Sequence, residues 1–112
     1  MPTSGDVVEV DLGAPTGSEA GLRRPALVVT AERILTHRPT VIQVVPIAST
    51  VRGHATEVTL LAESVNGLDV DSSAQCQHIR AIAAQRIDHT LGNVGPVMLA
   101  QVRDTIATLL AL

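Results

Sequence analysis

Short runs of alternating or continuous apolar residues dominate the first 82 positions and predict a β-rich fold. The segment 6–12, DVVEVDL, alternates polar and apolar residues, which predicts a half-buried strand with Val8 and every second residue after it on one face. The segment 25–30, PALVVT, is almost continuously apolar and is typical of a central strand. Proline cannot donate a hydrogen bond to a neighbouring strand, so Pro25 is expected at the first strand position.

Three later segments also have the length and composition of strands. TVIQVVPIAST (40–50) is β-branched through most of its length, and Pro46 within it favours an edge strand or a bulge. TEVTLL (56–61) alternates and is expected to pair back across a turn at 51–55. SSAQCQHIRAI (72–82) is predicted to be one strand with four residues on a common face, namely Ala74, Cys76, His78 and Arg80.

Helical signals are confined to short segments and to the C-terminus. One helical turn is expected in 31–39 and another in 83–92, and Asn66-Gly67 predicts a turn in the loop 62–71. A long helix is predicted to begin near Pro96. Strands followed by one amphipathic helix predict a small, strongly bent barrel or half-barrel. The apolar positions that define the helix are Leu99, Val102, Ile106, Leu109 and Leu110.

Composition changes this picture in three ways. A length of 112 residues predicts one domain spanning 1–112, and the absence of Phe, Trp and Tyr predicts a core of Val, Ile, Leu and Ala. The same absence excludes base stacking on aromatic side chains as a way to hold RNA. The formal net charge of −3 argues against a protein that coats nucleic acid, although a cluster of arginines could still form a local positive groove.

Several common kinds of site are absent from the sequence. Cys76 is the only cysteine, and the four histidines lack the spacing of metal ligands, so no disulfide, metal or other cofactor is expected. No G-x-S-x-G, P-loop or G-x-G-x-x-G motif occurs. No apolar run approaches the ~20 residues of a transmembrane helix and no signal peptide is recognisable, so a soluble cytoplasmic protein without a membrane partner is expected.

The first candidate site is the segment 17–24 of the loop 13–24. It contains GSEAGLRRP, in which Glu19 precedes the twin arginines Arg23 and Arg24. Charged loop residues are most often simply solvated. An arginine directly before a buried strand, however, has its backbone fixed by the sheet, and its guanidinium can then clamp a phosphate through two hydrogen bonds.

The segment QCQHIR is the second candidate site. A half-buried structural histidine is the simpler interpretation of His78, whereas Arg80 could equally serve the site or form a structural ion pair with Asp6 or Asp11.

The end of the strand 40–50 is the third candidate. Ser49 and Thr50 are most often turn formers, because their hydroxyls bind nearby backbone groups. They are candidates for the site only if the strand end lies beside the segment 17–24.

These segments occur in a distinctive order: GDVVEVDL, GSEAGLRRPALVVT, VVPIAST and HIRAIAAQRI, followed by the amphipathic helix. That order resembles the MazF/PemK/Kid family of toxin endoribonucleases over nearly the whole chain. The most specific element is G-S-E followed closely by R-P and an apolar strand. The resemblance implies a small SH3-like barrel with a C-terminal helix, of the CcdB/PemK/MazF kind, and a homodimer, which Val- and Leu-rich strands also favour.

The resemblance also implies an activity and a partner. Members of the family are toxins of type II toxin–antitoxin systems that cut single-stranded messenger, ribosomal or transfer RNA at short sequences without a metal. The substrate's 2′-OH is the nucleophile, and the product carries a 2′,3′-cyclic phosphate. A cognate antitoxin is expected to lay an extended acidic segment across the RNA groove.

Carried over by motif, Arg24 is the arginine of R-P and the main catalytic residue at the scissile phosphate, and Glu19 is the carboxylate of G-S-E. Two positions depart from the pattern: Ala48 replaces the usual threonine, and Gln77 replaces the usual acid of D/E-Q-I-R. The catalytic residues implied or proposed are Arg24, Glu19, Ser49 and His78, and the RNA contacts are Ser18, Arg23, Thr50, Gln77 and Arg80.

The chemistry requires a base for the 2′-OH, an acid for the leaving 5′-oxygen and donors for the charge on phosphorus. Arginine is a poor base because its pKa lies above about 12, so Glu19 or His78 is expected to be the base. Two other functions remain open: a protein of the same fold that poisons a protein target such as DNA gyrase, and a member that binds RNA or antitoxin without cutting.

Overall fold

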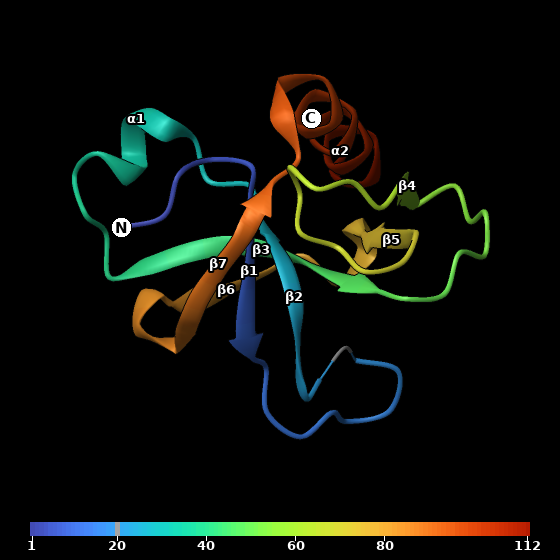
Figure 1. The fold of residues 1–112 in the computed structure, drawn as a ribbon, viewed down its shortest axis with the longest axis horizontal. Coiled ribbons are helices and arrows are strands. Elements are labelled where there is room, and N and C mark those ends of the chain that lie inside the picture. The colour runs from blue at the N-terminus through green and yellow to red at the C-terminus, as the bar shows by residue number, and fades with distance from the viewer. Residues whose placement is uncertain (20) are drawn as a thin grey trace.

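The computed structural model describes residues 1–19 and 21–112, which form a strongly bent antiparallel sheet with a long helix packed on it (Figure 1). The strand order is β4-β5-β3-β2-β1-β7, with β6 also paired with β3, so the sheet of the described residues is a half-barrel with β4 and β7 at its edges. In chain order the elements are β1 (Asp6–Asp11), β2 (Arg23–Val28), α1 (Glu32–Leu35), β3 (Val41–Ala48), β4 (Glu57–Leu60), β5 (Ser72–Gln75), the 3-10 turn η1 (Cys76–His78), β6 (Arg80–Ala83), the 3-10 turn η2 (Ala84–Arg86), β7 (Ile87–Asn93) and α2 (Gly95–Leu110).

The sheet buries apolar side chains on both faces, which accounts for the near-continuous apolar runs of β2 and β3. One face packs under α2, which contributes Leu99, Val102 and Ile106. The other face includes Val8, Val10 and Leu12, so the predicted shared face of the first strand is confirmed. Leu109 and Leu110 are exposed, and the predicted apolar face of the terminal helix is correspondingly shorter.

Both prolines lie deeper in the sheet than predicted. Pro25 is the third residue of β2, not the first, and pairs with Glu9 of β1. The pairing of β2 with β3 begins only at the next residue, so the missing N–H falls where no β3 partner is present. Pro46 lies in a central strand, not at an edge. β3 pairs with β6 up to Val44 and with β5 from Ile47, and Pro46 lies between these two partners.

The predicted strand 72–82 is wrong as a single element. The turn η1 interrupts it, with Ile79 N donating to Cys76 O at 3.1 Å, because β5 and β6 pair with opposite ends of β3. The predicted common face is therefore lost: Cys76 is fully buried, whereas His78 and Arg80 are partly exposed.

A strand was also missed at the C-terminal side of 83–92. β7 pairs with β1 at the edge of the sheet, and its centre, Asp88-His89-Thr90, is exposed and polar. An edge strand of this kind lacks the apolar alternation that predicts a half-buried one.

The loop 62–71 makes the predicted turn at Asn66-Gly67 and packs on β7. Buried Asn66 donates to Leu61 O at 2.8 Å and accepts from Leu68 N at 3.0 Å. Asn93 N of β7 donates to Val65 O at 2.8 Å, which fixes the loop against the strand. In the part of the chain that the structure describes, no helix has the length and apolar character needed to span a bilayer.

Candidate active site

An open pocket of about 400 Å³ lies where the loop between β1 and β2 approaches η1 and the start of β6. Figure 1 shows that this loop extends at the opposite end of the molecule from α2. The two sides of the pocket come from segments that are nearly sixty residues apart in sequence, the loop at Glu19 and the turn that begins the stretch 77–80. Its lining contains four of the predicted site residues and one isoleucine, namely Glu19, Gln77, His78, Arg80 and Ile79.

Arg24 lies at the base of the same loop, although it does not line the pocket. Its backbone belongs to β2 and pairs with Val10, so the sheet fixes its position. Its Nε donates to Gly21 O at 2.9 Å. The terminal nitrogens of the guanidinium make no hydrogen bond to residues 1–19 or 21–112. An arginine held by its backbone and Nε in this way presents two donors in a fixed plane, which suits a phosphate group.

Arg23 has a different environment from its neighbour. It forms an ion pair with Asp88 of β7, and both side chains are about half exposed. An exposed ion pair of this kind is weak, so a phosphate could compete with Asp88 for the guanidinium.

Arg80 contacts the loop base and does not form the ion pair with Asp6 or Asp11 that the sequence suggested. Its Nη1 donates to the backbone oxygen of Leu12 at 3.3 Å. Arg86 makes a similar contact, from Nη1 to Asp11 O at 3.2 Å. Two guanidinium groups thus lie beside the start of the loop.

The remaining predicted residues lie outside the pocket lining. Ser18 is exposed in the loop next to Glu19, and Ser49 and Thr50 are exposed directly after β3. β2 and β3 are antiparallel neighbours whose register ends at Ala26 and Pro46, so Arg24 and Ala48 emerge at the same end of the sheet. This pairing brings the end of β3 to the same end of the sheet as Arg24, while Ser49 and Thr50 do not line the pocket that the loop forms with η1.

The family is decided by comparison with known proteins. The family of PemK-like, MazF-like toxins of type II toxin–antitoxin systems matches residues 3–110. The chain belongs to this toxin family.

Individual relatives extend over the same length. The toxin is 36% identical over 110 residues to endoribonuclease MazF9 of Mycobacterium tuberculosis, which covers 95% of this chain and 93% of the relative. MazF from Deinococcus radiodurans is 28% identical with a TM-score of 0.83, over 99% of this chain and 97% of that chain. A MazE–MazF structure from the same bacterium is 28% identical with a TM-score of 0.76, over 99% and 96%. The predicted family and its barrel-like fold are confirmed.

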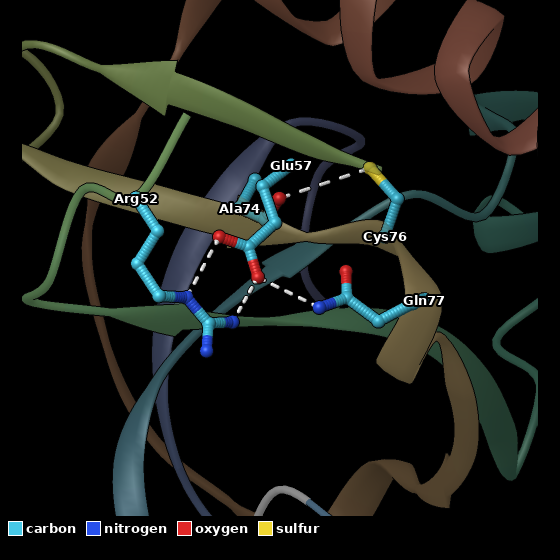
Figure 2. A network of polar contacts seen from close by, with 5 residues as sticks. All are labelled: Arg52, Glu57, Ala74, Cys76 and Gln77. Carbon is cyan, nitrogen blue, oxygen red and sulfur yellow. Dashed lines mark hydrogen bonds and ion pairs between the residues drawn. The ribbon is translucent and has the colours of Figure 1, made fainter. Parts of the chain in front are cut away.

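The toxin has a polar network beside the pocket that the sequence did not reveal. Glu57, the first residue of β4, has a side chain that is only 1% exposed. Figure 2 shows Arg52 and Gln77 directed at its carboxylate from two sides. Arg52 Nε donates to Oε1 at 3.5 Å and Nη2 forms an ion pair with Oε2, while Gln77 Nε2 donates to Oε2 at 2.7 Å.

The charge on Glu57 is maintained by these partners. Burial by itself would raise the pKa of Glu57, but the hydrogen bonds from Arg52 and Gln77 and the positive charges of Arg52 and His54 outweigh burial and lower the pKa below its ordinary value of 4.5. Glu57 is thus ionised at neutral pH. A lone glutamate in an alternating strand carries no sequence signal for such a role.

The residues that line the pocket include types that can exchange protons. Glu19 carries a carboxylate and His78 an imidazole, and Arg80 is part of the same lining. Within residues 1–19 and 21–112, no three His, Cys, Asp or Glu side chains gather as a metal ion requires.

Proposed function

We propose that the toxin is a metal-independent endoribonuclease that cuts single-stranded RNA at a short specific sequence in the cytoplasm and so inhibits translation and growth. A single domain, residues 1–112, carries the activity. The 2′-OH attacks the adjacent phosphorus, the bond to the 5′-oxygen breaks, and the products carry a 2′,3′-cyclic phosphate and a 5′-OH. The 36% identity to a relative that is named an endoribonuclease supports the reaction. The observation that carries the site is Arg24, held in β2 and through Nε.

Arg24 binds the scissile phosphate and stabilises the charge that develops on its oxygens. Removing one such preorganised donor typically costs about 10²–10³ in rate. We therefore expect Arg24→Ala to reduce kcat by about that factor, and Arg24→Lys to recover only part of it, because an ammonium cannot donate from two nitrogens in one plane. Arg33→Ala, at an exposed position of α1, is the matched control and should cleave as wild type does. Full activity of Arg24→Ala would contradict the assignment.

Glu19 and His78 divide the proton transfers between them. A carboxylate can accept the 2′-OH proton, which is the role proposed for Glu19, and an imidazole can donate a proton to the 5′-oxygen, which is the role proposed for His78. Both line the same pocket, which allows them to approach one phosphodiester from two directions. Ser49 is an auxiliary donor to the phosphate, and Ser18, Arg23, Thr50, Gln77 and Arg80 contact the RNA.

The pH dependence of cleavage separates these two roles. If His78 is the acid, kcat of wild type falls toward alkaline pH, and His78→Gln is slow and loses that dependence. Glu19→Gln should lose the fall toward acid pH in the same way. A wild-type profile that is flat from pH 5 to 8 would exclude His78 from proton transfer.

Incubation of the toxin with a defined single-stranded RNA in the presence of EDTA tests the activity as a whole. We expect cut product with a cyclic phosphate, and no cut where the nucleotide 5′ of the cleavage site carries 2′-deoxyribose. Intact RNA would contradict the proposal. Intact RNA together with inhibition of DNA gyrase would indicate the protein-binding alternative.

Two protein partners complete the proposal. A cognate antitoxin is expected because the family consists of toxins from toxin–antitoxin systems. A homodimer is expected from the family resemblance and from a groove of about 420 Å³ between α1, β3 and α2, whose lining includes exposed Ile34 and Leu112. Sedimentation that gives a monomer mass at micromolar concentration would contradict the homodimer.

A further inference from the structure

Glu57 dictates the orientation of the Gln77 amide. An ionised carboxylate can only accept hydrogen bonds, so Gln77 must turn its nitrogen, not its oxygen, toward Glu57. The amide oxygen is then directed away and is buried without a hydrogen-bond partner among the described residues. A buried acceptor without a partner is destabilising. The amide therefore keeps an orientation that is unfavourable for its own oxygen because Glu57 holds it there.

Glu57 also joins two segments that carry predicted site residues. Arg52 belongs to the segment between β3 and β4, three residues after Ser49. Gln77 belongs to η1 and is followed by His78, and both line the pocket. The backbone supports the same junction, since Cys76 N donates to Thr56 O at 3.1 Å. A single buried carboxylate thus connects the end of β3 to the wall of the pocket.

We propose that Glu57, held by Arg52, is a positioning residue of the active site that fixes the Gln77 amide and with it the wall of the pocket that contacts RNA. It touches neither the RNA nor the reacting atoms in the mechanism above, and the inference rests on the proposed function. Because it acts on a binding wall, its loss should affect RNA binding more than the chemical step.

Glu57→Gln is the direct test, because it keeps the size of the side chain and removes its ability to dictate orientation. A glutamine at 57 can offer either its oxygen or its nitrogen, so Gln77 is no longer confined to one orientation. We expect KM for a defined RNA to rise about tenfold while kcat changes by less than about threefold. Glu63→Gln, at an exposed position outside the network, is the matched control and should match wild type. Equal KM values for Glu57→Gln and wild type would overturn the proposal.

An exchange of the two side chains tests whether the pair itself is required. Gln77→Glu alone places two carboxylates in contact and should weaken RNA binding. The double variant Glu57→Gln/Gln77→Glu restores one carboxylate and one amide within reach of each other, and we expect it to recover most of the wild-type KM. A double variant no better than either single variant would contradict the pairing.

Arg52→Gln perturbs the same network with less effect on folding than Glu57→Gln. Arg52 is 42% exposed and lies in a loop, so its replacement should leave the fold intact. If Arg52 acts through Glu57, Arg52→Gln/Glu57→Gln raises KM no more than the larger single effect. Additive effects would show that the two residues act separately and would overturn the shared role. The Kd for an uncleavable 2′-O-methyl RNA is measured in parallel. If wild type binds the 2′-O-methyl RNA but does not cut the unmodified RNA of the same sequence, the proposed catalysis fails, and the Kd of Glu57→Gln still decides the positioning role.

Discussion

Gly67 is the position where a single added methyl group should be most costly. Its φ is +70°, a conformation that L-residues rarely adopt, and a Cβ there would lie 2.2 Å from Leu91 O and 2.7 Å from Leu91 C. Both atoms are backbone of β7, which is paired with β1 and so cannot move away easily.

The cost of Gly67→Ala can be worked from these contacts. The positive φ costs about 1 kcal/mol for alanine. Relief of the clash requires the loop to lift from β7, which breaks the bond from Asn93 N to Val65 O and weakens the bond from Asn66 Nδ2 to Leu61 O, at about 1 kcal/mol each. The sum is about 3 kcal/mol. For a domain of this size, at about 4 °C per kcal/mol, Tm should fall by roughly 12 °C.

Gly53→Ala is a closely matched control. Gly53 has the same φ of +70°, but nothing lies within 4 Å of its added Cβ. It should therefore cost only the conformational part, about 1 kcal/mol. The assay is thermal or urea unfolding followed by far-UV circular dichroism, since the chain has no aromatic residue to report by fluorescence. Equal losses for the two variants would refute the argument that the close approach to β7 matters.

Two further predictions follow from the perturbed groups. Because the pKa of Glu57 is lower in the folded protein than its ordinary value of 4.5, its contribution to stability is present above that pH and is lost as the pH falls through the lowered pKa. Urea unfolding from pH 7 to 3 should show a steeper loss for wild type than for Glu57→Gln, and parallel curves would contradict this. Burial raises the pKa of Cys76 to about 11, so its thiol is neutral and enclosed at pH 8. Iodoacetamide should label it only in urea, as mass spectrometry can establish, and rapid labelling of the folded toxin would be the contrary result.

Strands that are buried on one face or on both faces of the sheet could be predicted from the sequence. The first strand and the face of Val8 were predicted correctly because period-2 alternation reflects burial on one face. β7 was not predicted, because its central residues are polar and it lies at the sheet edge. The break at η1 was missed for a different reason. It depends on β5 and β6 pairing with two ends of β3, and a local pattern contains no information on partners.

In the candidate site, too, local sequence patterns were informative and tertiary contacts could not be predicted. Arg24 was predicted from its place before a buried run, and it lies in β2, where the sheet fixes its backbone. An ion pair with Asp6 or Asp11 was one of the alternatives for Arg80, and in the structure its guanidinium instead donates to the backbone oxygen of Leu12, because folding places the start of β6 beside the end of β1. Glu57 had no motif at all, since its role arises only when the segments carrying Arg52 and Gln77 meet.

The difference between a local sequence pattern and the contacts of the folded chain also affects how the two departures from the family motif, Ala48 and Gln77, are interpreted. Considered one position at a time, Ala48 lacks the hydroxyl and Gln77 lacks the carboxylate of the family motif. In the folded chain, Gln77 donates at 2.7 Å to the ionised carboxylate of Glu57 on β4, so the side chain at 77 is held by a defined partner although it carries no charge itself. Whether a site retains its chemistry therefore depends on the charge and the donors that the fold assembles there, and a substitution at one position must be judged together with the residues that contact it.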